Sequence, residues 1–75
     1  MIKVRVTLEG YLKGKYFEVK EMEYSNPVKI EQVLKDAQIS NVDVFIIVKE
    51  GCIVRQDYIL TESSEIKLIP VIGGG

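Results

Sequence analysis

The fold of the chain is set by the stretch Glu65-Ile66-Lys67-Leu68-Ile69-Pro70-Val71-Ile72-Gly73-Gly74-Gly75. Its first half alternates charged and apolar side chains, which is the period of a β-strand with one buried face, so Ile66 and Leu68 are expected to point inward. Pro70 has no amide hydrogen to donate to a neighbouring strand and should end the pairing. Residues 72–75 should then leave the sheet as a tail that stays mobile until it is bound.

Two strands are expected at the start of the chain. Residues 2–9 alternate in the same way and predict the first of them. The second should begin at about Lys15, with Phe17 and Val19 inward. A bulge near Lys20-Glu21 would then exchange the two faces of this strand, because one extra residue reverses the side-chain parity.

A helix and a hairpin should follow. Ser25-Asn26-Pro27 is typical of a helix start, since Ser and Asn cap helices and Pro fits the first turn. Residues 42–49 read as a strand, Glu50-Gly51 as a turn and residues 52–55 as the returning strand, whereas Asp57 to Leu60 reads as a short connection. The helix shows one apolar stripe, which consists of Ile30, Val33, Leu34 and Ala37.

One amphipathic helix must bury its stripe against the strands. The economical arrangement is an α+β domain, in which the helix packs across one face of a mixed sheet of four to five strands. With 75 residues the chain has room for a single domain, residues 1–75.

Composition argues against several classes of function. No apolar run approaches the ~20 residues that span a bilayer, so no membrane association is expected and the cytoplasm is the simplest location. The net charge is -1 with no basic block, which argues against nucleic-acid binding. With no histidine and one cysteine, the chain lacks the usual general base and the usual zinc ligands. We therefore expect no metal site and no enzyme, but a protein that reacts inside a partner's active site.

Residues 44–54, the passage from Leu60 to Pro70 and the Gly-Gly end together resemble the ubiquitin-like β-grasp sulfur carriers of the ThiS/MoaD type. ThiS serves thiazole synthesis, and MoaD is the small subunit of molybdopterin synthase. The resemblance implies a β-grasp fold and a reactive carboxyl group on Gly75, presented by Gly74 and Gly73. Glycine suits such a tail because it has no Cβ and can enter a narrow slot.

The resemblance also implies the partners. A ThiF/MoeB-like adenylyltransferase would use ATP to adenylate Gly75, while the chain itself binds no cofactor. A cysteine desulfurase or a rhodanese-like protein would supply sulfur and leave a thiocarboxylate. That group would donate its sulfur to a small molecule, with thiazole synthase as the partner in thiamine synthesis, or with the large subunit of molybdopterin synthase as the partner in molybdopterin or tungstopterin synthesis.

A surface for these partners is expected beside the tail. Period two places Phe45 and Ile47 on the outer face of their strand, and Ile69 on the outer face of the last strand. They form an exposed apolar patch unless a loop or a register shift covers them. The residues expected to contact a partner are Phe45, Ile47, Ile69, Pro70, Ile72 and Gly73.

Alternatives remain at this point. A ubiquitin-like modifier would use the same activation of Gly75 but end in an isopeptide bond to a lysine. A non-catalytic β-grasp interaction module would leave the tail idle. Cys52 is either a thiol activated by Lys49 and Arg55 or, more simply, a small strand residue.

Overall fold

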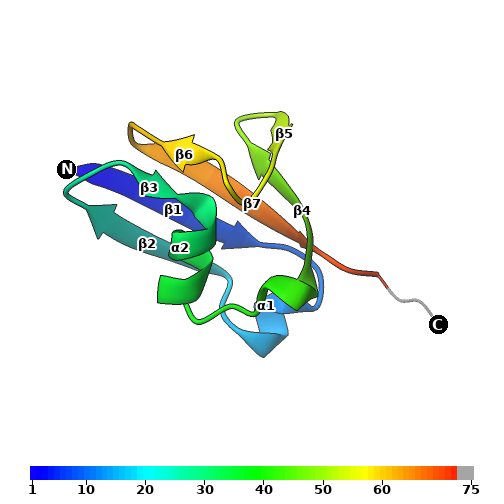
Figure 1. The fold of residues 1–75 in the computed structure, drawn as a ribbon. Coiled ribbons are helices and arrows are strands. Elements are labelled where there is room, and N and C mark those ends of the chain that lie inside the picture. Colours follow the sequence, from blue (N-terminus) through cyan, green and yellow to red (C-terminus); the bar gives the residue numbers. More distant parts are fainter. Residues whose placement is uncertain (73–75) are drawn as a thin grey trace.

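The computed structural model describes residues 1–72 and shows a five-stranded mixed sheet (Figure 1). β1 and β7 run parallel at its centre, and the other neighbouring strands are antiparallel. The predicted α+β class with a mixed sheet is therefore confirmed. The order across the sheet is β2 (Val19–Tyr24), β1 (Ile2–Leu8), β7 (Ser64–Pro70), β4 (Val44–Lys49) and β5 (Cys52–Val54).

The other elements are short. β3 (Val28–Lys29) pairs with β6 (Ile59–Leu60) in a separate two-stranded sheet, which the sequence did not predict. The main helix is α2 (Ile30–Asp36), and single turns form α1 (Leu12–Lys15) and the 3₁₀ helix η1 (Asn41–Asp43). Within residues 1–72, none of the helices has the length and apolar character needed to cross a membrane.

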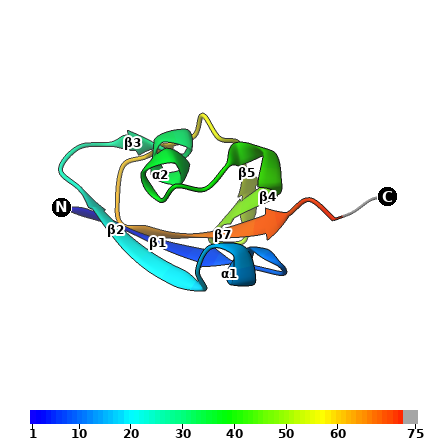
Figure 2. The same cartoon turned by 90° about the horizontal axis from the view of Figure 1, so that it is seen from below.

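Figure 2 shows α2 across one face of the main sheet, and the buried side chains of the two elements form the core. All four residues of the predicted helix stripe are buried in it. Ile66 and Leu68 of β7 are fully buried, as their alternation predicts. The apolar faces of the helix and of the central strands thus exclude water from each other, which is the main stabilising term in a domain of this size.

The first hairpin differs from the prediction. α1 occupies the place where the second strand was expected to begin, and Leu12 within it is fully buried. β2 then pairs with β1 without any register shift, so the bulge predicted near Lys20-Glu21 is absent. Val19 pairs with Thr7 and is exposed rather than inward. The helical turn α1 changes which residues of β2 face the core, so β2 needs no extra residue.

α2 begins at Ile30 and not at Ser25-Asn26-Pro27 as predicted. No side chain caps this helix. The backbone N–H groups of Ile30 and Glu31 instead donate to the carbonyls of Tyr58 and Gln56, at 3.0 and 2.8 Å. The loop before β6 thus satisfies amides that a capping side chain would otherwise take.

A bulge in β4 changes which residues of that strand face the core. Val44 pairs with Pro70 but Ile46 pairs with Ile69, so two steps of β4 match one step of β7. Phe45 lies in the bulge and is 68% exposed, whereas Ile47 is 4% exposed. The prediction that Ile47 shares the outer face with Phe45 is therefore wrong, because the extra residue reverses the parity after the bulge.

Candidate functional site

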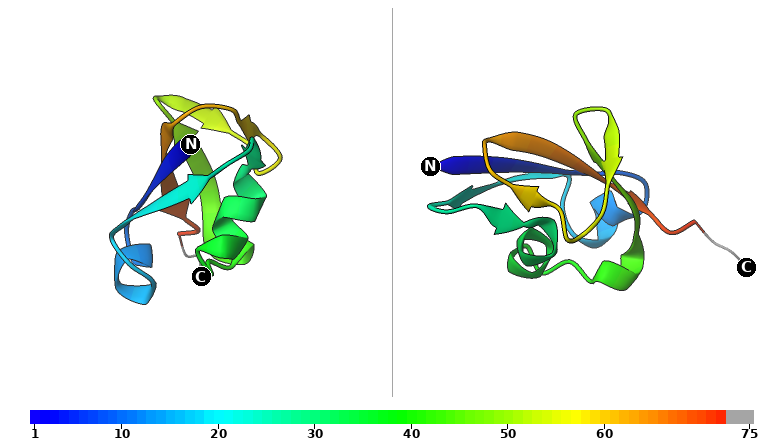
Figure 3. Two further views of the ribbon diagram at one scale, coloured as in Figure 1. Left: turned by 90° about the vertical axis from the view of Figure 1, so that its left-hand side faces the viewer. Right: turned by 45° about the horizontal axis from the view of Figure 1, so that its top comes forward.

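The chain leaves the main sheet at the end of β7. The strand ends at Pro70 as predicted, and in the right-hand view of Figure 3 the chain continues away from the sheet. Ile72 is 85% exposed. The predicted reactive residues Gly74 and Gly75, and the predicted contact residue Gly73, lie outside the described residues.

Pro70 is buried where the chain leaves the sheet. Gly10 packs against its ring: a Cβ on Gly10 would lie 2.9 Å from Cγ of Pro70, and Gly10 has φ +57°. The ring of Pro70, a residue predicted to contact a partner, thus supports the exit point. Residues 9–11 and 69–72 line an open groove of about 400 Å³ there.

Replacing Gly10 by Ala should destabilise the domain by about 1–3 kcal/mol, because Ala strains at positive φ and its Cβ would press on Pro70. Gly14 is the matched control, since no atom lies within 4 Å of a Cβ built there. Gly14→Ala in α1 should be neutral or stabilise by up to about 1 kcal/mol. Urea unfolding of both variants checks this, and equal effects at the two positions would contradict the close approach.

Apolar side chains gather on the outer face of the sheet beside this exit. Ile46 pairs with Ile69 across β4 and β7, and Val48 pairs with Ile53 across β4 and β5. The sequence predicted Phe45 and Ile69 here but missed the other three; the expected hairpin at Glu50-Gly51 was the signal that could have placed Ile53 opposite Val48. We call these residues the outer patch: Phe45, Ile46, Val48, Ile53 and Ile69.

Solved structures with the same arrangement include two kinds of small protein. One, from Pyrococcus furiosus, is described as a molybdopterin converting factor, subunit 1; it has a TM-score of 0.77 and 15% identity, over 96% of this chain and 100% of that one. Two structures of small archaeal modifier protein 1 from Haloferax volcanii also reach 0.77. The first is 15% identical to this chain, over 97% of this chain and 99% of its own. The second is 13% identical, over 96% of this chain and 100% of its own.

The chain has the β-grasp fold. The predicted resemblance to ubiquitin-like β-grasp proteins of the MoaD type is thereby confirmed for the fold. Neither the family models nor the curated protein sequences contain a match to this chain.

A polar cluster joins α1 and the residue after it, Tyr16, to η1 near the exit. One carboxylate oxygen of Asp43, Oδ2, accepts from Lys15 Nζ at 2.8 Å and from the Tyr16 hydroxyl at 2.6 Å. These bonds, first the one from Lys15 and then the one from Tyr16, hold the pKa of Asp43 below its usual range. The bond to Asp43 likewise raises the pKa of Lys15. Both groups therefore stay ionised at neutral pH.

Cys52 is exposed in β5, directly opposite Lys49. The Lys49 ammonium donates to Glu50 at 3.2 Å, so it is engaged by a neighbouring carboxylate. Cys52 is therefore a strand residue, as the simpler interpretation expected, but not a buried one. In the part of the chain from 1 to 72, no group of three or more His, Cys, Asp or Glu side chains is placed to hold a metal ion.

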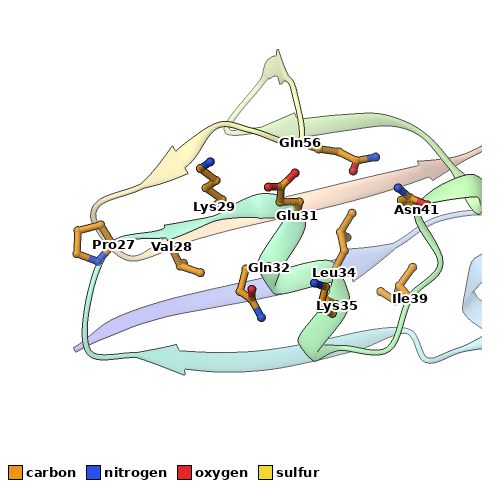
Figure 4. A pocket seen from close by; sticks show the side chains of 10 residues that line it. All are labelled: Pro27, Val28, Lys29, Glu31, Gln32, Leu34, Lys35, Ile39, Asn41 and Gln56. Carbon is orange, nitrogen blue, oxygen red and sulfur yellow. The ribbon is translucent and has the colours of Figure 1, made fainter.

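A second groove, of about 680 Å³, lies on the helix side of the β-grasp domain. Figure 4 shows Pro27 and Val28 at one end, Ile39 and Asn41 at the other, and side chains of α2 between them. Its rim mixes charged and amide groups with apolar ones. It shares no lining residue with the groove at the exit, so it has no part in the candidate site.

Proposed function

We propose that this β-grasp domain is a sulfur carrier that works through the carboxyl group of Gly75. The observation that carries the proposal is the arrangement at the end of β7. There the chain leaves the sheet with Ile72 exposed, next to the outer patch, and the sequence continues as Gly73-Gly74-Gly75. The domain would act as a co-substrate in the cytoplasm and not as an enzyme.

The chemistry needs three steps on partner proteins. The Gly75 carboxylate attacks the α-phosphate of ATP, pyrophosphate leaves, and an acyl-adenylate forms. The terminal sulfur of a protein persulfide then attacks the acyl carbon, AMP leaves, and a thiol reduces the resulting S–S bond. The products are a thiocarboxylate on Gly75 and a disulfide, so one oxygen of the carboxylate has been replaced by sulfur.

The partners follow from these steps and from the family resemblance. A ThiF/MoeB-like adenylyltransferase would contact the outer patch and supply the ATP site, and a cysteine desulfurase or rhodanese-like protein would carry the persulfide. Exposed apolar patches of this kind commonly mark protein interfaces. The sulfur would pass to a small molecule bound by thiazole synthase or by the large subunit of molybdopterin synthase.

The test is a change in intact mass. After incubation with its adenylyltransferase, ATP and a sulfur source, the protein should gain about 16 Da, the difference between sulfur and oxygen. The mass of the protein purified from its own cells first checks that Gly75 carries a free carboxyl group. An unchanged mass, in the presence of an enzyme active on another carrier, would contradict the proposal.

Conjugation to proteins is the second candidate, and the likeness to small archaeal modifier protein 1 favours it over an idle tail. Here the activated Gly75 would be attacked by a lysine amine to give an isopeptide bond. Slowly migrating conjugates in cells, lost when Gly75 is removed, would support this function. If both the conjugates and the mass change are absent, a non-catalytic interaction module remains.

A further inference from the structure

The base of the tail has one backbone anchor beyond β7. The N–H of Val71 donates to the carbonyl of Asp43 at 3.1 Å, and within residues 1–72 this is the last backbone hydrogen bond before the tail. Pro70 can make no such bond, because it lacks the hydrogen. The peptide unit of Asp43 therefore holds the point from which the chain departs.

The side chain of the same residue is held from the other direction. Asp43 is only 16% exposed in its side chain, and its Oδ2 receives both the Lys15 ammonium and the Tyr16 hydroxyl. The Tyr16 oxygen also accepts from the backbone N–H of Ser40, at 3.2 Å, and its ring packs on the core. η1 is thus held at both ends. Its last residue, Asp43, is bonded to Lys15 and Tyr16, and the residue before it, Ser40, is bonded to Tyr16.

We propose that Asp43 is a positioning residue for the tail, which fixes the direction in which residues after Val71 leave the sheet. Its side chain is bonded to α1 and to Tyr16, and its carbonyl holds Val71. This inference rests on the proposed function in one respect, namely that Gly75 is the reacting group.

A fixed direction matters because the domain and the tail must enter a partner together. Gly75 lies four residues beyond Val71 in the sequence, which corresponds to about 13 Å of extended chain. If the outer patch docks first, a tail whose base at Val71 is already held loses less freedom on binding. Loss of the anchor should therefore weaken productive binding more than it slows the chemical step.

The ion pair between Lys15 and Asp43 is not enough by itself to hold Asp43 in place. Lys15 is 53% exposed in its side chain, and exposed pairs of this kind contribute little to stability. The Tyr16 hydroxyl, half-buried, is the more constraining partner. Tyr16→Phe keeps the ring in the core and removes the bonds to Asp43 and Ser40. It is the conservative variant that separates positioning from packing.

The experiment compares Asp43→Ala and Tyr16→Phe with the wild type. Adenylation kinetics with the carrier as the varied substrate should show KM raised about three- to tenfold, with kcat within twofold, as the loss of one or two hydrogen bonds implies. Hydrogen exchange of the Val71 amide should become faster in both variants. Asp36→Ala is the matched control, because Asp36 also accepts a tyrosine hydroxyl, from Tyr24 at 2.8 Å.

Each outcome decides the inference. Faster Val71 exchange together with a raised KM in Asp43→Ala, but not in Asp36→Ala, supports it. Unchanged Val71 exchange or unchanged KM in Asp43→Ala overturns it, as does an equal rise of KM in Asp36→Ala. If the wild type itself is not adenylated, the proposed function fails, and Val71 exchange alone then decides whether Asp43 anchors the tail.

Discussion

Deletion of Gly74 and Gly75 is expected to abolish the 16 Da product and to leave the fold intact. The buried core and its hydrogen bonds lie within residues 1–72, so thermal unfolding should be unchanged. The new carboxyl group, on Gly73, falls short of its former position by two residues, or about 7 Å. A shift of about 1 Å can already cost a hundredfold in rate, so we expect a loss of at least that size by intact-mass assay.

Phe45→Ala serves as the control for this deletion. It removes contact area from the outer patch but leaves the tail whole, so it should still form the product at high carrier concentration. Full product from the truncated protein would contradict the role of Gly75. Complementation by the truncated protein of cells that lack the wild type would have the same meaning, and would favour an interaction module.

The elements predicted correctly are those whose signal lies within one stretch of chain. β1, β7 and the stripe of α2 each repeat with the period of a strand or a helix, and each buries the residues that the period selects. β3 and β6 are two residues each, which is too short to show a period. Their pairing joins Val28 to Leu60, and only the folded chain brings these residues together.

The candidate site was predicted in part for the same reason. Phe45, Ile69 and Ile72 lie at the surface or half-buried there, and their positions follow from local alternation and from the end of the strand. Ile47 does not, because the bulge arises where Val44 meets Pro70, and no local pattern marks it. The bonds of Asp43 to Lys15 and Tyr16 join residues 28 and 27 positions apart, beyond the reach of any local pattern.

Ile47→Ala should cost about 2–5 kcal/mol of the free energy of unfolding, as buried Ile-to-Ala changes do. Ile47 pairs with Leu68, which is fully buried, and the cavity would open in the core. A 75-residue domain has a total stability of about 4–11 kcal/mol, so the change removes a large share of it. Phe45→Ala, at an exposed position, should change stability by less than about 0.5 kcal/mol. Urea unfolding measures both.

The effects of the two substitutions on binding to the adenylyltransferase should be in the opposite order to their effects on stability. Phe45→Ala should raise KM for the adenylyltransferase about tenfold, the effect of removing an aromatic side chain that a partner buries. Ile47→Ala should leave KM nearly unchanged under conditions where the variant is still folded, because its side chain does not reach the surface. If β4 kept strict alternation without a bulge, both residues would face outward and both variants would be stable and bind weakly. A stable Ile47→Ala protein with a raised KM would therefore contradict the bulge and restore the larger patch, whereas a destabilised one assigns Ile47 to the core and leaves Phe45 to the partner.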